Sequence, residues 1–315
     1  MKHSRYGMQT TSGIGRGTAS IVVGIAVFFF LTVPIAIMFA QASSSSGQKP
    51  VIAVSILPQA EFVQKIAGNS ISVVTLVGQG ASPHNYEPSP RQMTALSTAS
   101  MWFTIGVEFE NALIPKIKAL YPKLKIIDTT QGIIYRNLEA HAHEGEEVHN
   151  EEESGKDPHV WLGYEAVKAQ LAVILDELTV LNPTNKAQYK KNYDSYIQAI
   201  DVLFAQLKKD LAPMKGQTVF VYHPSFGYFF DEFGINQEAV EAGGKEPSQK
   251  SLALLIKKAQ EDKVKVIFVQ KQFSTNAAKT IAKAIGGSVV EIDPLATNWL
   301  ENIMIMGKAL QKAAR

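Results

Sequence analysis

The stretch TNKAQYKKNYDSYIQAIDVLFAQLKKDL, residues 184–211, contains neither glycine nor proline. Asn182-Pro183-Thr184, at its start, combines a proline with residues that favour helix N-termini. At 1.5 Å per residue, a helix of this length extends for about 40 Å. We therefore predict one long rigid helix over residues 183–211, a stiffer connection than a linker rich in glycine and serine. Its apolar side chains recur at the spacing of one helix face, at Tyr189, Tyr193, Tyr196, Ile197, Ile200, Leu203, Phe204 and Leu207.

On both sides of this helix, short β-branched runs alternate with amphipathic stretches, a pattern typical of parallel sheets with crossover helices. The predicted fold class is α/β, with two lobes at residues 49–182 and 212–315, each a mainly parallel sheet flanked by helices. The expected strands are Val51–Ile56, Ile71–Val77, Met101–Ile105, Lys125–Ile127, Thr218–Tyr222, Glu238–Glu241, Val264–Val269 and Ser288–Ile292. The expected helices are Gln59–Ala67, Arg91–Thr98, Phe109–Leu120, Phe226–Phe233, Ser248–Glu261, Thr275–Ile285 and Asn298–Ala313.

Composition excludes several classes of protein. The chain has 315 residues, of which 46% are hydrophobic and 19% charged, as in ordinary globular proteins. It contains no cysteine, which excludes disulfides, thiolate metal sites, iron–sulfur clusters and a lipid-modified N-terminal cysteine. The formal net charge of +2 is too small to indicate a nucleic-acid partner. We expect a monomer.

The first 48 residues have the pattern of an export signal followed by a linker. Lys2, Arg5 and Arg16 precede the uncharged run Ile21–Ala40, and Ala40-Gln41-Ala42 forms a small-x-small cleavage pattern before a serine run. The apolar run is long enough to remain as a membrane anchor, so cleavage and anchoring both stay open. Either interpretation places the rest of the chain outside the cytoplasm. Without the three basic residues, 28 basic and 29 acidic residues remain, a formal charge of −1.

Residues 139–157 form a segment rich in histidine and acidic side chains. Within HAHEGEEVHNEEESGKD, residues 141–157, seven carboxylates and three histidines accompany a single aliphatic residue. Such a composition cannot bury a core, so we predict a surface loop in the first lobe. One interpretation is a solvated acidic loop, and the other is weak metal binding by His141, His143 and His149.

Three further histidines lie beside prolines in predicted loops: His84 in SPHNYEP, His159 in DPHVW and His223 in VYHPSFGYF. His223 directly follows a predicted strand, as does Asp293 in EIDPLA. The carboxyl ends of parallel strands face the ligand crevice of an open sheet, so these loops are expected to converge. Three neutral imidazoles and one carboxylate suit zinc. The sequence therefore predicts a zinc site.

These stretches resemble the metal-binding solute-binding proteins of ABC transporters, a group that includes zinc-uptake proteins and manganese-binding relatives once called adhesins. Further matches are VSILPQAEFVQKIAGNSISVVTLVGQGASPHNYEPSPRQM and GGKEPSQKSLALLIKKAQEDKVKVIFVQKQFS. The resemblance covers most of the chain from Val51 onward. It implies two α/β lobes bridged by one long helix, and His84, His159, His223 and Asp293 as metal ligands. The chain departs from the family in lacking the lipid-modified cysteine.

The resulting hypothesis is an extracytoplasmic protein that captures Zn²⁺, with Mn²⁺ as a further candidate. It would deliver the ion to an ABC permease driven by a cytoplasmic ATPase. The alternatives are a secreted zinc-dependent hydrolase and a metal-binding surface adhesin. A catalytic zinc needs an open coordination position and a nearby general base. The sequence has no HExxH helix and no GxSxG elbow, and a fourth ligand at Asp293 would close the site. These features favour transport over catalysis.

Overall fold

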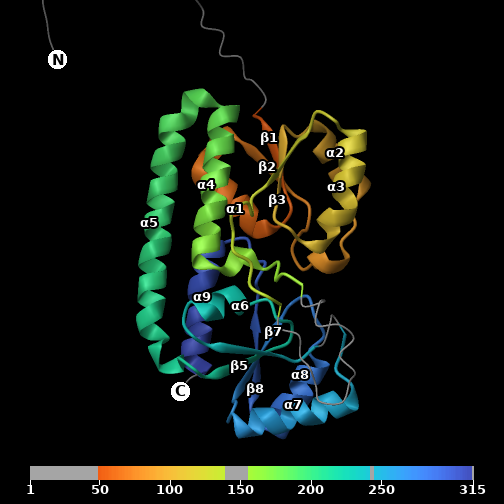
Figure 1. The fold of residues 1–315 in the computed structure, drawn as a ribbon, viewed down its shortest axis with the longest axis vertical. Coiled ribbons are helices and arrows are strands. Elements are labelled where there is room, and N and C mark those ends of the chain that lie inside the picture. Colours follow the sequence, from red (N-terminus) through yellow and green to blue (C-terminus); the bar gives the residue numbers. More distant parts are fainter. Residues whose placement is uncertain (1–48, 139–154, 242–244, 314–315) are drawn as a thin grey trace, which may run out of the picture. The chain divides into compact units, whose positions relative to one another are not determined.

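The computed structural model describes residues 49–138, 155–241 and 245–313, which contain two parallel four-stranded sheets (Figure 1). The first sheet has the order β2-β1-β3-β4 and the second has the order β6-β5-β7-β8. Both sheets therefore use the same order of second, first, third and fourth strand. The strands are β1 (Val51–Val54), β2 (Ser72–Thr75), β3 (Met101–Thr104), β4 (Lys125–Asp128), β5 (Thr218–Val221), β6 (Asn236–Ala239), β7 (Val266–Gln270) and β8 (Ser288–Ile292).

Helices follow the strands in both lobes, and all eight predicted strands are present with boundaries that differ by a few residues. The predicted α/β class with two lobes is confirmed. The helices are α1 (Leu57–Ala67), α2 (Pro90–Thr98), α3 (Glu108–Leu120), α4 (Tyr164–Leu181), α5 (Lys186–Asp210), α6 (Gly227–Asp231), α7 (Gln249–Glu261), α8 (Asn276–Ala284) and α9 (Trp299–Ala313). Short 3₁₀ turns lie at Gly68–Ser70, Pro83–Asn85, Val160–Leu162, Pro183–Asn185 and Ala212–Met214.

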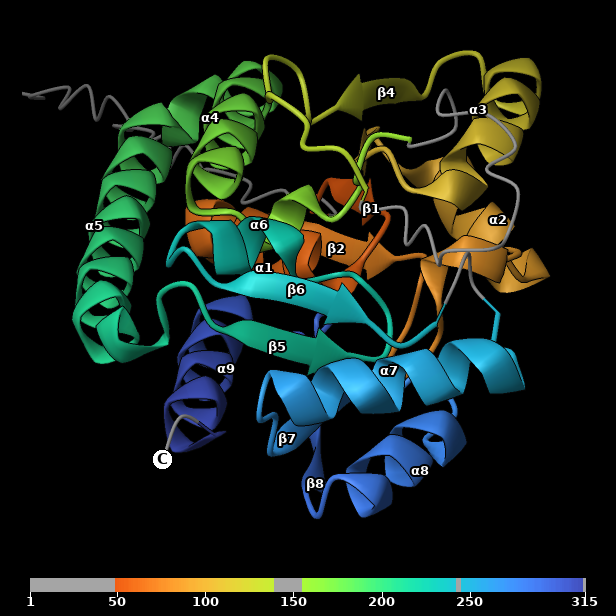
Figure 2. The ribbon, with the colours of Figure 1, turned by 60° about the horizontal axis from the view of Figure 1, so that its bottom comes forward.

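Helix α5 is the predicted joining helix, with 25 residues in regular α-helical conformation. Its predicted apolar stripe is the buried face: Tyr189, Tyr196, Ile200, Phe204 and Leu207 are all buried. Residues 164–181 form α4, for which the sequence pattern predicted no separate helix. Figures 1 and 2 show α4 and α5 side by side, so the joining helix is supported along one side by a second long helix.

The C-terminal helix α9 returns to the first lobe and packs against α5. There the ring of Trp299 meets Phe62 of α1 edge-on, with 5.4 Å between ring centroids. The Trp299 backbone N–H donates to the carboxylate of Glu61, and the Tyr196 hydroxyl of α5 donates to the same carboxylate at 3.0 Å. The indole of Trp161 donates to the carbonyl of Pro294 at 2.8 Å. Buried apolar rings and satisfied polar groups thus join the two lobes.

Two predictions from the N-terminal half fall partly or wholly outside the described residues. Residues 1–48, with the predicted signal or anchor, lie outside them, as do His141, His143 and His149. Among the helices of the described residues, none is both long enough and apolar enough to cross a membrane. The end of the predicted exposed loop differs from expectation, because Asn137 and Lys156 form an antiparallel bridge and Asp157 is fully buried.

Candidate metal centre

The three proline-flanked histidines meet between the two lobes. His84 lies in a 3₁₀ turn after β2, His159 directly precedes another 3₁₀ turn, and His223 lies two residues beyond β5. The Ser82 side chain accepts from the backbone N–H of His84 and so fixes the first turn. Because His84 and His159 come from the first lobe and His223 comes from the second, the cluster spans both.

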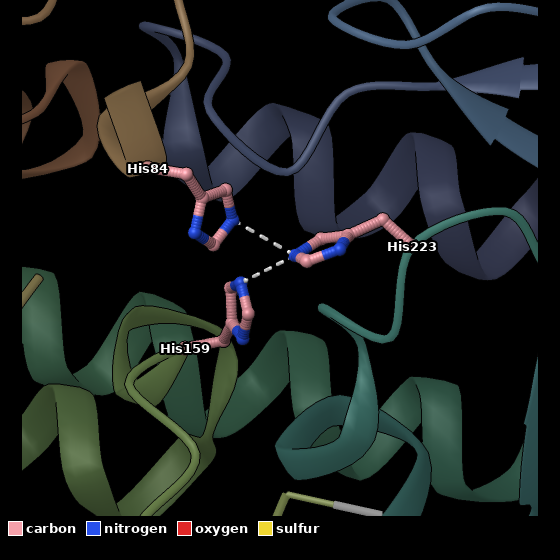
Figure 3. A group of neighbouring side chains, drawn as sticks. All are labelled: His84, His159 and His223. Carbon is pink, nitrogen blue, oxygen red and sulfur yellow. Dashed lines mark hydrogen bonds between the residues drawn. The ribbon is translucent and has the colours of Figure 1, made fainter. Parts of the chain in front are cut away.

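The Nε2 atoms of the three rings point toward one another (Figure 3). His223 Nε2 lies 3.0 Å from His84 Nε2 and 3.3 Å from His159 Nε2, and one ring nitrogen from each residue falls within 4.8 Å of the others. In a tetrahedral zinc site with Zn–N bonds of ~2.0–2.1 Å, two ligand nitrogens lie about 3.3 Å apart. The spacing of the cluster therefore matches that of zinc ligands.

Each of the three rings presents its other nitrogen, Nδ1, to a carboxylate. The distances are 2.9 Å from His84 to Glu108, 2.7 Å from His159 to Asp157 and 2.8 Å from His223 to Glu241. A neutral imidazole carries one N–H, and a carboxylate at Nδ1 holds it there. We infer from these partners that all three Nε2 atoms are unprotonated. Three lone pairs that converge in this way repel one another and attract a cation.

The carboxylates are charged partners of the histidines. Burial alone would raise the pKa of Asp157, but its hydrogen bonds, first of all the one from the His159 ring and also the one from Arg136, outweigh burial and lower that pKa. For Glu108 the same opposition, with His84 as the partner, also gives a lowered pKa. Carboxylates behind the ligand histidines are a common feature of metal sites, where they fix the ring orientation.

His223 is sheltered from protonation. Burial lowers its pKa to about 4, because the charged imidazolium is poorly solvated there. The hydrogen bond to Glu241 opposes this lowering only in part. The ring of Phe273 stacks on that of His223 at 4.8 Å between centroids. His223 is therefore neutral, the form that binds metal, throughout the physiological range.

The histidines line a cavity of about 20 Å³, together with Ser82, Pro83, Trp161, Ser225, Gln272, Phe273, Pro294 and Leu295. This volume accommodates one water-sized occupant, and hence one metal ion rather than an organic ligand. His159 and His223 are 3% and 7% exposed, whereas His84 is partly open to solvent. The cavity can therefore hold a single desolvated ion, and solvent reaches it on the side of His84.

The fourth predicted ligand, Asp293, lies outside the three-histidine group. Its Oδ1 accepts from the backbone N–H of Leu295 at 2.9 Å and from Gln272 Nε2 at 3.3 Å. Gln272 also lines the histidine cavity, whereas Asp293 lines a neighbouring cleft of about 460 Å³. Gln272 thus contacts Asp293 and also lines the histidine cavity. Asp293 as a ligand stays a prediction.

The sequence analysis did not identify the three carboxylates behind the histidines. Glu108 follows β3 and Glu241 follows β6, so the rule about the carboxyl ends of strands applies to both. Asp157 had been assigned to the exposed acidic loop. Its place two residues before His159 was a usable signal, since an aspartate can accept from the backbone N–H two residues ahead, as it does here at 2.9 Å.

Comparison with known proteins agrees with this geometry. Residues 52–313 match the family described as "ZnuA: Zinc-uptake complex component A periplasmic". The high-affinity zinc uptake system protein ZnuA of Bacillus subtilis is 27% identical over 259 residues, which cover 81% of each chain. The zinc-binding lipoprotein AdcA of Streptococcus pneumoniae is 28% identical over 254 residues, and this chain spans only half of its length.

Solved structures lead to the same family. A crystal structure of ZnuA aligns with a TM-score of 0.78 and 35% identity, covering 85% of this chain and all of that one. The periplasmic zinc-binding protein TroA of Treponema pallidum aligns with a TM-score of 0.73 at 18% identity, which shows the shared fold. These matches confirm the predicted resemblance and favour transport over the hydrolase and adhesin alternatives. The chain belongs to the family of ZnuA, the periplasmic component of zinc uptake.

Proposed function

We propose that this chain is the solute-binding protein of an ABC transporter for zinc, with His84, His159 and His223 as ligands of the transported ion. The observation that carries the proposal is the convergence of the three Nε2 atoms at 3.0 and 3.3 Å. The ion would be captured between the lobes and delivered to a membrane permease that a cytoplasmic ATPase drives. Bound zinc would also raise the thermal stability, because it binds the folded chain and joins both lobes.

The test is zinc affinity, measured by competition with a chromogenic chelator, for single alanine variants of the three histidines. We expect each variant to lose more than about 100-fold in affinity, because a first ligand matters more than the outer partners that are worth 10–100-fold. His149→Ala, in the acidic loop, is the matched control and should keep the tight site. A tight site that survives all three substitutions would contradict the proposal.

Zinc is the proposed cargo because the donor set is rich in nitrogen. Zinc accepts tetrahedral imidazole sites, whereas manganese favours shells with more oxygen ligands. His223→Glu should therefore narrow the preference for zinc over manganese, chiefly by weakening zinc. His223→Ala should weaken zinc without any gain for manganese. Equal zinc affinity in wild type and both variants would remove His223 from the ligand set.

We also propose Asp293 as a fourth ligand, which reaches the ion when the Gln272 side chain moves aside. The hydrogen bond from Gln272 Nε2 to Asp293 Oδ1 supports this arrangement. Asp293→Asn should weaken zinc binding, and Gln272→Ala should not, because it removes the intervening side chain without removing a charged ligand. If Asp293→Asn leaves the affinity unchanged while Gln272→Ala reduces it, the glutamine rather than the aspartate completes the site.

For the acidic loop we propose a second, weaker role in metal binding through His141, His143 and His149. Leu138 and Gly155 are already paired, with the Leu138 N–H donating to the Gly155 carbonyl at 2.9 Å. Residues 139–154 can therefore be replaced by Asn-Gly, which closes a two-residue hairpin. The shortened chain should lose the weak sites and retain one tight site. Loss of the tight site would show that the loop supplies primary ligands.

The family places the chain outside the cytoplasm, and we propose that residues 21–40 take it there. The mass of the mature N-terminus distinguishes the two remaining possibilities. A chain that begins after Ala42 was cleaved, and an intact chain recovered with the membrane fraction is anchored. An intact chain in the cytoplasmic fraction would contradict both.

A further inference from the structure

One arginine connects the second lobe to the carboxylate behind His159. Arg136 lies between β4 and α4, and its side chain is 16% exposed. Nη1 donates to Asp157 Oδ2 at 3.1 Å, and Nε donates to Asp231 Oδ2 of α6 at 2.9 Å. Helix α6 follows β5 of the second lobe. A single guanidinium therefore contacts a carboxylate in each lobe.

The carboxylate of Asp157 divides its two oxygens between Arg136 and His159. Oδ1 accepts from both the backbone N–H and Nδ1 of His159, at 2.9 and 2.7 Å, while Oδ2 accepts from Arg136. Asp157 is 0% exposed, so water does not replace a lost partner. The orientation of the His159 ring thus depends on a carboxylate that Arg136 holds from the other side.

Tyr228 of α6 makes a second connection between the same residues. Its hydroxyl accepts from the Arg136 backbone N–H at 3.1 Å and donates to the Asp157 carbonyl at 2.9 Å. The backbone of Arg136 in turn accepts from the Asp157 N–H at 2.9 Å. Side-chain and backbone contacts from α6 therefore reach both Arg136 and Asp157.

Gly227, the first residue of α6, leaves the space that the guanidinium occupies. A Cβ at this position would lie 1.5 Å from Arg136 Nη1 and 2.3 Å from its Cζ. The arginine side chain would have to leave in response, since it is the flexible partner in the contact. The Arg136 guanidinium thus packs against the backbone of the second lobe, in addition to its ion pairs with the two carboxylates.

We propose that Arg136 is a positioning residue that couples the contact between the two lobes to His159 and so slows zinc release. This inference rests on the proposed function, because it assumes that His159 binds the transported ion. With both carboxylates engaged, Asp157 is fixed and His159 Nε2 points at the other two ligands. Without the Asp231 arm, the guanidinium is held less firmly and the support of the His159 ring weakens. Arginine suits this role because its planar fork engages two carboxylates at fixed geometry.

The experiment measures the rate of zinc release into excess chelator, together with the visible absorption spectrum of the Co²⁺-loaded protein. Asp231→Asn removes the negative charge from the second-lobe partner of Arg136 and should speed release about two- to threefold. Glu232→Gln is the matched control: Glu232 follows Asp231 and accepts from the Tyr164 backbone N–H of α4 at 3.3 Å, a contact that does not include Asp157 or His159. It should leave the release rate and the spectrum unchanged.

Three further variants test the arginine itself. Arg136→Lys keeps the charge but reaches one carboxylate, so it should match Asp231→Asn, and the double variant should add nothing. Gly227→Ala should have the same effect by displacing the guanidinium without changing any charge. Arg136→Gln should speed release about tenfold, at the lower end of the range for residues behind metal ligands, and shift the cobalt spectrum.

The outcomes separate this proposal from the proposed function. If His159→Ala retains tight zinc binding, the ligand assignment itself is wrong. If His159→Ala loses zinc while Asp231→Asn, Arg136→Lys and Gly227→Ala all keep the wild-type release rate and cobalt spectrum, the positioning role of Arg136 is overturned. Should Arg136→Gln fail to fold, the Asp231 variant still decides, since that carboxylate is 57% exposed and contributes little to stability.

Discussion

The two lobes share one strand order but differ in the packing of their sheets. In the first lobe, Ile52, Ala53 and Val54 of β1 belong to a single apolar core, although neighbouring residues of a strand face opposite sides. In the second lobe the faces of β5 separate. Val221 belongs to that same core, whereas Phe220 belongs to a smaller outer cluster together with residues of α7 and α8.

This difference divides the molecule into a platform, which is built on the common core, and an outer part of the second lobe that packs independently of that core. The common core extends from the first sheet through α4, α5 and α9 to the inner face of the second sheet. The outer cluster stands apart from it, and its buried members include Leu255 of α7 and Ile281 of α8. The first lobe supplies two of the three histidines from the platform. The second lobe supplies His223, at the end of the strand that separates the two clusters.

The largest expected effects concern these two cores. Phe62→Ala removes the ring that contacts Trp299, and we expect a loss of about 3–5 kcal/mol in the free energy of unfolding. Ile281→Ala in the outer cluster should cost about 2–5 kcal/mol. Urea unfolding measures both losses. Hydrogen exchange should show faster opening of both lobes in the first variant, and of α7 and α8 alone in the second. Uniform loosening of the whole chain by Ile281→Ala would contradict the separation of the clusters.

The lobes are also expected to respond to pH in opposite directions. Burial raises the pKa of Glu110 in the first lobe from 4.5 to about 7, against the hydrogen bonds from the backbone of Ile105 and Gly106. Between pH 4.5 and 7 the folded chain holds a proton that the unfolded chain releases. The contribution of Glu110 to the free energy of unfolding therefore falls as pH rises through this range. Burial lowers the pKa of His223 from 6.5 to about 4. Its contribution is present above pH 6.5 and falls as pH drops toward 4.

Each shift of 2.5 pKa units is worth about 3 kcal/mol in the zinc-free protein. Urea unfolding at pH 5 and at pH 8 measures the effect of Glu110 in the first lobe. Glu110→Gln should reduce the fall in the free energy of unfolding between these two pH values by about 3 kcal/mol. His223→Gln should flatten the fall between pH 6.5 and 4. An unchanged pH dependence in either variant would show that the group does not titrate as its burial implies.

A smaller effect is expected behind the second-lobe ligand. Glu241 is 3% exposed, and its Oε1 accepts from His223 Nδ1. Glu241→Gln keeps an acceptor oxygen of similar shape and removes the charge that stabilises the metal-bound imidazole. Loss of an outer partner of this kind costs about 10–100-fold in metal affinity. Zinc competition titration measures it, with His149→Ala as the control variant. Wild-type affinity in Glu241→Gln would contradict a role for this charge.

Much of the fold was predictable because its signals are local. The uninterrupted stretch 184–211 and the alternation of β-branched and amphipathic runs depend on neighbours along the chain. Helix α4 was not identified as a separate element, since its N-cap is Gly163, which lacks the capping side chain of Ser, Thr, Asp or Asn that marks a helix start. Its place beside α5 follows from burial against tertiary neighbours, which the sequence does not show.

The site was predictable in part for the same reason. His84, His159 and His223 stood out because each lies beside a proline in a loop, and His223 also directly follows a predicted strand. The carboxylates behind them lie 24, 2 and 18 positions from their histidines, and only the pairing of Asp157 with His159 is local in sequence. The contact of Arg136 with Asp231 of α6 spans 95 positions and depends on the meeting of the two lobes. The pairs of Glu108 and Glu241 with their histidines are each set by the folding of one lobe.

The smallest effect should lie behind the first-lobe ligand that is most open to water. Glu108 accepts from His84 Nδ1 at 2.9 Å, as Glu241 does from His223, but its side chain is 48% exposed. Solvent screens an exposed charge and readily replaces a lost partner, so Glu108→Gln should weaken zinc binding by only about two- to threefold. The same competition titration, run beside Glu241→Gln at low and high salt, measures the difference. Added salt should shrink the Glu108 effect further and leave the Glu241 effect nearly unchanged, because a buried charge is screened less. Equal losses for the two variants would mean that burial does not distinguish the partners of the two lobes.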